Sequence, residues 1–142
     1  MVRVHGTSVA LGVDGVLLRG PSGAGKSDLA LRLIDQGARL VADDQTELHL
    51  DGNAIHMTAP ATIAGQLEVR GLGILRVPTV ASAPLRLVVD LVPSQNVERM
   101  PEEQTCDLLG QPVPLLALAA FEASTPAKLR LALSQLTTST AS

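Results

Sequence analysis

The stretch GVLLRGPSGAGKSDLALRLIDQG, residues 15–37, joins an apolar strand, a glycine-rich loop and an amphipathic helix. Residues 20–27, GPSGAGKS, fit the pattern G-x-x-x-x-G-K-[ST], in which the N–H groups of the loop and of the helix start surround phosphate oxygens. Apolar residues 16–18 predict a buried strand before the loop, and residues 25–36 predict a helix that ends at Gly37. The stretch therefore indicates an α/β fold that binds a nucleotide polyphosphate.

Each residue type in the loop has a physical reason to be there. Glycines at three positions let the backbone turn tightly and point its N–H groups inward. Lys26 supplies a full positive charge to the β- and γ-phosphates, and Ser27 offers a hydroxyl to Mg²⁺. Lysine occurs only at positions 26 and 128. We expect nucleotide contacts along the whole loop: Gly20, Pro21, Ser22, Gly23, Ala24, Gly25, Lys26 and Ser27.

Two adjacent carboxylates, Asp43 and Asp44, follow the apolar strand predicted over residues 39–42. Phosphoryl transfer needs an acidic group near the metal and a group that positions or deprotonates the acceptor. Because neighbouring side chains of a strand face opposite ways, the two aspartates are expected to do different jobs unless the strand ends between them. One could hold Mg²⁺ through water while the other faces the acceptor hydroxyl. The alternative is an ordinary acidic turn after a strand.

The segment EVRGLG, residues 68–73, combines a carboxylate, a guanidinium and two glycines. Glu68 could be a metal ligand, and Arg70 could stabilise the charge of a transferring phosphate. The alternative is a strand with a surface ion pair and a bulge. Taken alone, His5 is more typical of a structural histidine and Arg99 of a solvated loop. Cys106 shows no sign of a nucleophile.

The remaining patterns predict mostly short strands. We expect strands over residues 2–11 and 85–92, a hairpin over 47–57 that turns at Asp51-Gly52, and a helix over 125–136. Residues 93–114 are polar and contain several prolines, which favours loop and turn. Residues 115–120 fit a strand or a short helix equally, since periodicity does not separate the two for a short apolar run.

Composition excludes several classes of function. The 142 residues include 46% apolar residues but a single Phe and no Trp or Tyr, which counts against a base-stacking platform for single-stranded nucleic acid. The net charge of −3 implies no basic patch for duplex DNA. With one cysteine, no secretory signal and no long apolar run, the chain is expected to be cytoplasmic, with no membrane partner.

Four segments together resemble the catalytic domain of HPr kinase/phosphorylase, a bacterial serine protein kinase family whose fold is unlike that of eukaryotic protein kinases. They are VHG at 4–6, GVLLRGPSGAGKS at 15–27, RLVADD at 39–44 and LEVRGLGI at 67–74. The resemblance implies a P-loop kinase fold of the PEP-carboxykinase-like type, with a mixed sheet and flanking helices. It also implies a single catalytic domain over residues 1–142, without the N-terminal domain of full-length members.

The same resemblance implies roles for individual residues. Lys26 stabilises the transferring phosphoryl group, and Asp44 accepts the proton of the target serine. His5 lies close to the phosphates. Glu68 and Ser27 bind Mg²⁺, with Asp43 near the metal, and Arg99 matches, more weakly, a further active-site arginine of the family.

At the level of the whole protein, the resemblance implies ATP and Mg²⁺ as cofactors. It implies a serine of an HPr-type phosphocarrier protein of the phosphotransferase system as acceptor, and a hexameric homo-oligomer. The chain departs from the family where an arginine- and proline-rich loop tied to dephosphorylation is replaced by AAFEASTPAK, residues 119–128. Because free phosphate needs cationic partners and this segment carries Glu122 and no arginine, we expect phosphorolysis to be weak or absent.

Other P-loop functions make different demands on the sequence. A small-molecule or nucleotide kinase usually needs an arginine-rich lid, and no compact basic segment is present. A GTPase should show an N/T-K-x-D motif, which the lysine of PAKLR, residues 126–130, does not provide. A non-catalytic nucleotide-sensing module would keep the loop and lose the base, so Asp44 and Glu68 argue against it.

Overall fold

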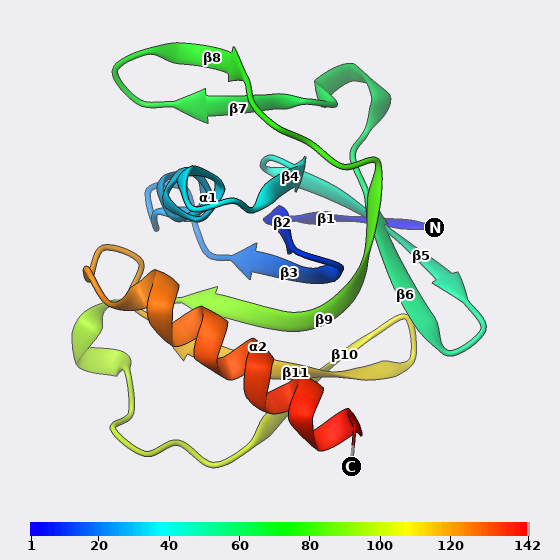
Figure 1. Cartoon of the computed structure of the whole chain (residues 1–142), viewed down its shortest axis with the longest axis vertical. Helices are drawn as coiled ribbons and strands as arrows, with labels where there is room; N and C mark the ends of the chain where they lie inside the picture. Colours follow the sequence, from blue (N-terminus) through cyan, green and yellow to red (C-terminus); the bar gives the residue numbers. More distant parts are fainter. Residues whose placement is uncertain (142) are drawn as a thin grey trace.

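The computed structural model describes the backbone of residues 1–141 and the side chains of residues 1–136. Within this part of the chain, strands outnumber helices and most elements are short (Figure 1). In chain order they are β1 (Val2–His5), β2 (Thr7–Leu11), β3 (Asp14–Arg19), α1 (Lys26–Asp35), β4 (Arg39–Ala42), β5 (Gln45–Asp51), β6 (Ala54–Thr58), η1 (Ala61–Ile63), β7 (Gln66–Val69), β8 (Gly73–Arg76), β9 (Ser82–Leu91), η2 (Ser94–Asn96), β10 (Gln104–Leu108), β11 (Gln111–Leu118) and α2 (Thr125–Ala141).

The main sheet is mixed and is organised around β9. Its strand order is β1-β5-β6-β9-β3-β2-β4, and β11 also pairs with β9 and carries β10 on its other side. β9 runs parallel to both β3 and β11, whereas the other pairs in the sheet are antiparallel. The carboxyl ends of β3, β9 and β11 therefore lie at one edge of the sheet, and the loop of residues 20–25 leaves β3 at that edge (Figure 1).

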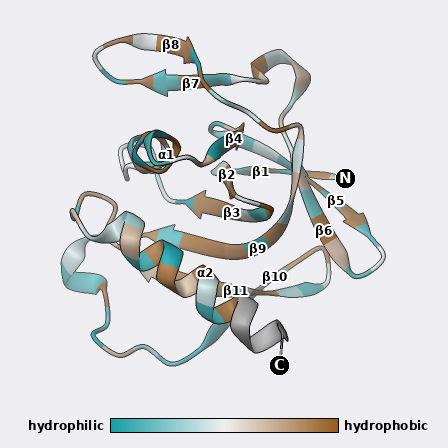
Figure 2. Ribbon diagram, in the orientation of Figure 1, coloured by the Kyte–Doolittle hydropathy of each residue, from teal (hydrophilic) through white to brown (hydrophobic). Residues whose placement is uncertain are grey.

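A bulge in β9 lets one strand serve two hydrophobic cores. The pairing with β3 passes from Gly15–Leu85 to Val16–Leu87, so Arg86 is the extra residue of the bulge. An extra residue reverses which face the following side chains reach. Accordingly Leu85 belongs to the core beside β5 and β6, whereas Leu87 belongs to the core that receives the helices. Figure 2 shows β3 and β9 as largely hydrophobic ribbons in the middle of the fold.

Both helices bury their apolar stripes in the same core. α1 contributes Leu29 and Leu33, α2 contributes Leu129 and Leu133, and the β7–β8 hairpin contributes Leu67. α1 lies between this hairpin and the main sheet (Figure 1). The predicted helix over 25–36 is confirmed as Lys26–Asp35, with Gly37 after it at φ +108° as a C-terminal glycine should be. α1 is thus fixed on two sides, which holds the phosphate-binding loop at its start.

Three sequence expectations need correction or completion. The strand predicted over 2–11 breaks at Gly6, so β1 pairs with β5 while β2 pairs with β3 and β4. Residues 93–114 are not all loop, because β10 and the first part of β11 lie there, and residues 115–118 continue β11 as a strand. Pairing of β11 with β9 begins only at Leu115. Pro112 and Pro114 therefore sit where β11 has a neighbour on one side, and a missing N–H is tolerated.

The hairpin predicted over residues 47–57 is confirmed as β5 and β6. None of the helices in the described part of the chain is long and apolar enough to cross a membrane.

Candidate active site

The phosphate-binding loop of residues 20–27 joins the half-buried end of β3 to the first turn of α1. Gly25 is the N-cap of α1 and has φ +100°, a conformation that side-chain-bearing residues rarely adopt. A Cβ there would lie 2.6 Å from the Ala120 Cβ and 2.8 Å from the Phe121 Cζ, so the space admits only glycine. The loop thus presents the amino end of α1, with its partial positive charge, to whatever occupies it.

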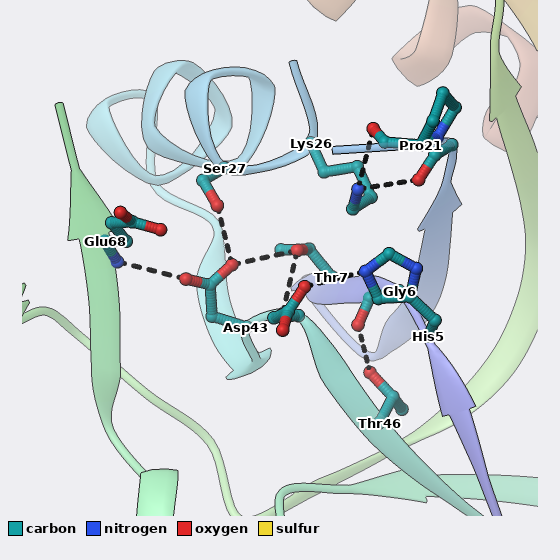
Figure 3. Close-up of polar contacts among 11 residues, drawn as sticks. His5, Gly6, Thr7, Pro21, Lys26, Ser27, Asp43, Thr46 and Glu68 are labelled. Atoms are coloured by element: carbon teal, nitrogen blue, oxygen red, sulfur yellow. Dashed lines mark hydrogen bonds and ion pairs between the residues drawn. The ribbon is translucent and has the colours of Figure 1, made fainter. Parts of the chain in front are cut away.

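Lys26, the single cationic residue of the loop, is buried. It is 7% exposed, and its Nζ donates to the Gly20 carbonyl at 2.7 Å and to the Pro21 carbonyl at 3.2 Å. The ammonium is thus held over the loop by the loop's own backbone (Figure 3). A phosphate in the loop would meet this charge together with the helix N–H groups.

Asp43 joins three separate elements through its carboxylate (Figure 3). Its Oδ1 accepts from the Ser27 hydroxyl at 2.7 Å and from the Thr7 hydroxyl at 2.9 Å, and its Oδ2 accepts from the Glu68 N–H at 3.0 Å. α1, β2 and β7 therefore meet at one buried carboxylate. The three donors give both oxygens of this buried carboxylate hydrogen-bond partners, which a buried polar group requires.

Asp44 follows directly but its side chain points elsewhere, and because β4 ends at Ala42 this difference comes from the turn after the strand and not from strand alternation. Its backbone has φ +68°, its N–H donates to the Thr7 hydroxyl at 3.1 Å, and its carbonyl accepts from the Gly6 N–H at 2.8 Å. Aspartate tolerates this left-handed conformation better than most residues do. The turn leaves the side chain 65% exposed, with its Oδ1 2.8 Å from the Nε2 of His5. Asp44 and His5 form a pair at the surface of the site, while Asp43 stays behind it.

The loop, α1 and the β7–β8 hairpin enclose a cleft of about 540 Å³. Most of the predicted site residues lie on its wall, among them Lys26, Ser27, Asp44 and Glu68. The complete lining is Ser22, Gly23, Gly25, Lys26, Ser27, Asp28, Leu31, Asp44, Glu68, Val69, Arg70, Gly71, Gly73 and Phe121. The cleft therefore contains cationic, carboxylate and backbone groups of the kinds that phosphoryl transfer uses.

The other predicted residues lie around this wall. Asp43 stands behind Ser27, His5 reaches the cleft through Asp44, and Gly20 and Pro21 carry the carbonyls that hold Lys26. Ala24, whose N–H donates to the Pro21 carbonyl at 3.0 Å, closes the turn of the loop.

Arg99 is the exception among the predicted residues. It is exposed in the segment between η2 and β10 and is not among the described residues that line the cleft.

The oxygen groups at the cleft fit a magnesium ion. Ser27 offers a hydroxyl, and Asp43 offers a carboxylate that accepts a hydrogen bond from that hydroxyl. The Glu68 carboxylate points toward Ser27 (Figure 3). In the described part of the chain, no three His, Cys, Asp or Glu side chains could hold a metal by themselves. Mg²⁺ does not need such a cage, because it is usually bound by one or two carboxylates together with water and substrate phosphates.

A salt bridge braces the edge of the sheet from which the loop starts. Arg19 at the end of β3 donates from Nε and Nη2 to the two carboxylate oxygens of Asp90 in β9, at 2.8 and 3.1 Å. Hydrogen bonding to Asp90 raises the pKa of the Arg19 guanidinium. The salt bridge ties the strand that delivers the loop to the central strand of the fold.

Sequence reasoning missed two residues of this site and left a third among open alternatives. Thr7 links Asp43 to Asp44 through a single buried hydroxyl, and its signal was a pair of hydroxyl residues, Thr7-Ser8, opening an otherwise apolar strand. Phe121 lies on the wall of the cleft although it is far away in the sequence. Arg70, weighed as a phosphate-stabilising residue, also lies on this wall.

Comparisons with known proteins agree with this architecture. The family model described as "HPr Serine kinase C-terminal domain" matches residues 1–129. The HPr kinase/phosphorylases of Burkholderia lata and Burkholderia mallei are each 40% identical over 121 residues. These matches cover 78% of this chain but 38% of each relative, so the chain spans well under half the length of the curated relatives.

A solved structure agrees over the whole chain. The structure of the Hpr(Ser) kinase/phosphatase from Coxiella burnetii is similar with a TM-score of 0.88 at 25% identity, over 100% of both chains. The predicted class, an α/β P-loop kinase fold with a mixed sheet and flanking helices, is confirmed. The chain therefore belongs to the HPr serine kinase C-terminal domain family.

Proposed function

We propose that the chain is an ATP- and Mg²⁺-dependent serine protein kinase whose acceptor is an HPr-type phosphocarrier protein of the phosphotransferase system. Family membership supports this reaction class. The observation that carries the proposal is that the neighbouring carboxylates of Asp43 and Asp44 point to different parts of the site. Asp43 bonds to the Ser27 hydroxyl of the phosphate-binding loop, while Asp44 lines the same cleft with its carboxylate exposed.

Binding of the nucleotide is the task of the loop. The N–H groups of residues 20–27 and the start of α1 surround the β- and γ-phosphates of ATP. When the nucleotide binds, the Lys26 ammonium leaves the carbonyls of Gly20 and Pro21 and contacts phosphate oxygens. The exchange is favourable because phosphate oxygens carry negative charge and carbonyl oxygens are neutral. The burial of Lys26 supports this role, because a desolvated charge interacts more strongly with its partner.

Transfer of the phosphoryl group requires removal of a proton from the acceptor. The serine oxygen forms a bond to the γ-phosphorus while the bond from that phosphorus to the β–γ bridging oxygen breaks, and ADP leaves. Asp44 accepts the serine proton, and His5 orients the Asp44 carboxylate through its contact at 2.8 Å. The exposure of Asp44 supports this assignment, since a protein substrate must reach it.

Charge at the transferred group is balanced by several partners. Ser27, Asp43 and Glu68 would hold Mg²⁺, which when bound neutralises charge on the phosphate oxygens. Arg70 on the wall of the cleft would add a guanidinium. Arg99 remains a prediction from the resemblance alone.

Three further points belong to this proposal. Phosphorolysis is weak or absent, because the segment after β11 brings Phe121 rather than an arginine to the cleft. The chain assembles as a homo-oligomer, and the family resemblance favours a hexamer. It works in the cytoplasm and binds no nucleic acid or membrane. Light scattering after size-exclusion chromatography tests the assembly, and release of phosphate from the phosphoserine carrier by inorganic phosphate tests phosphorolysis.

The decisive experiment mixes the protein with Mg-ATP and a purified HPr-like carrier and maps phosphoserine by mass spectrometry. Parallel reactions offer free nucleotides and sugars. The proposal expects one phosphorylated serine on the carrier and no product from the small molecules. Phosphorylation of a small molecule would indicate a P-loop metabolite or nucleotide kinase. Nucleotide binding without any transfer would indicate a sensing module.

A further inference from the structure

Phe121, the single aromatic residue of the chain, lies at the edge of the sheet where the phosphate-binding loop also begins. Because β3, β9 and β11 are parallel, the segments that follow their carboxyl ends emerge together. Ligands of α/β proteins bind in the crevice outside these ends. Phe121 follows the end of β11 at Leu118, so it lies where a nucleotide held by the loop after β3 could reach it.

The ring of Phe121 packs on the phosphate-binding loop itself. A Cβ at Gly25 would be 2.8 Å from the Phe121 Cζ and 3.1 Å from its Cε1, so the edge of the ring lies against the backbone of the loop. The residue is nevertheless 70% exposed, and it lines the cleft together with Leu31. A phenylalanine that served the core would be buried. Here most of the ring faces the cleft and solvent.

The backbone on either side of Phe121 is fixed by one guanidinium. Arg32 donates from Nη2 to the Ala120 carbonyl and from Nη1 to the Glu122 carbonyl at 3.3 Å. Its Nε donates to Asp28 at 3.0 Å, one turn earlier on α1. The Thr125 hydroxyl bonds to the Ala119 carbonyl as α2 begins. The exposed ring is therefore carried on an ordered turn attached to the same helix as Lys26, which lowers the entropic cost of using it in binding.

The side chains that line the cleft are of two kinds. Lys26, Asp44 and Glu68 are polar and charged, whereas Phe121 and Leu31 are apolar. A nucleoside triphosphate combines the same two chemistries, because it carries charged phosphates and a flat base with apolar faces. We propose that Phe121 is the platform on which the base of the bound nucleotide stacks. This inference rests on the proposed nucleotide site and extends it to the base.

The test separates the base from the phosphates. Calorimetry measures binding of a non-hydrolysable ATP analogue and of inorganic tripolyphosphate, both with Mg²⁺, to the wild type and to Phe121→Ala, Phe121→Leu and Phe121→Tyr. Loss of stacking by Ala or Leu should weaken the ATP analogue about tenfold or more, while Tyr keeps the ring and the affinity. Tripolyphosphate should bind all four proteins within about twofold, since it has no base. Equal melting temperatures would show that the variants are folded.

Three results would overturn the inference. The first is an unchanged affinity of Phe121→Ala for the ATP analogue, measured where the wild type binds both ligands. That result would rule out base stacking on Phe121 but would leave the proposed nucleotide site standing. The second is an equal loss for tripolyphosphate, which would mean that Phe121 merely supports the loop. The third is unchanged nucleotide binding with a raised KM for the protein acceptor, which would assign the ring to docking of that protein. A wild type that binds neither ligand would overturn the proposed function as well.

Discussion

Replacing Asp43 with asparagine should destabilise the whole domain, because this carboxylate joins α1, β2 and β7. The carboxylate accepts three hydrogen bonds, two at Oδ1 and one at Oδ2. Asparagine has one acceptor oxygen. If the asparagine oxygen accepts from Ser27 and Thr7, the asparagine NH₂ group faces the N–H of Glu68. Two donors then face each other with no acceptor between them.

The expected magnitude follows from that loss. One hydrogen bond to a charged group is removed and a buried donor is left unsatisfied, which costs about 1.5–3 kcal/mol. For a domain of this size the melting temperature should fall by about 5–10 °C. Thermal and urea denaturation followed by circular dichroism would measure both quantities.

Asp44→Asn is the matched control for Asp43→Asn. Its side chain is largely exposed, and asparagine adopts the left-handed backbone conformation of residue 44 readily. The free energy of unfolding of Asp44→Asn should fall by less than about 1 kcal/mol, since an exposed ion pair contributes little to stability. Equal stability of the two variants would refute the claim that the buried Asp43 carboxylate holds α1, β2 and β7 together.

Three other perturbations test separate parts of the structure. Lys26→Ala should weaken a Mg²⁺-bound, non-hydrolysable ATP analogue at least about tenfold by calorimetry, because one charge-assisted contact to phosphate is lost; unchanged affinity would remove Lys26 from the phosphate site. Gly6→Ala should cost about 1–3 kcal/mol in urea denaturation, because its Cβ would lie 2.8 Å from the Leu17 Cδ1 and 2.9 Å from the Leu18 carbonyl oxygen; a neutral effect would mean that the break between β1 and β2 does not depend on close packing. Burial raises the pKa of the Cys106 thiol, so at pH 8 the native protein should be alkylated more slowly than the urea-unfolded chain, as followed by mass spectrometry; equal rates would contradict it.

Local chemistry explains what the sequence predicts well. The phosphate-binding loop, the helix after it and the glycine that ends this helix depend on residues adjacent in the chain, and all three are found. The different orientations of Asp43 and Asp44 also follow from a local feature, because β4 ends at Ala42 and residue 44 turns into a left-handed conformation. Short-range backbone preferences are enough for these parts.

Contacts between distant segments explain what the sequence does not predict. β10 and β11 pair through a segment whose prolines favour loop, and nothing local shows that the second half of β11 lies beside β9. Thr7 becomes a site residue only because β2 lies beside β4, which brings its hydroxyl to both aspartates. Phe121 reaches the cleft because three strands are parallel, and strand direction is a property of the whole sheet.

In the proposed reaction Asp44 removes the proton of the acceptor and takes no part in binding the nucleotide. The most direct measurement compares wild type and Asp44→Asn in a single experiment that reads both the affinity for the ATP analogue and the rate of phosphoserine formation on the carrier. If Asp44 is the general base, the two affinities should be equal within about twofold and the transfer rate of Asp44→Asn should be lower by about 10²–10⁴-fold, the usual contribution of such a base. Transfer at the wild-type rate, or a fall in rate that merely follows a fall in nucleotide affinity, would contradict this role of Asp44.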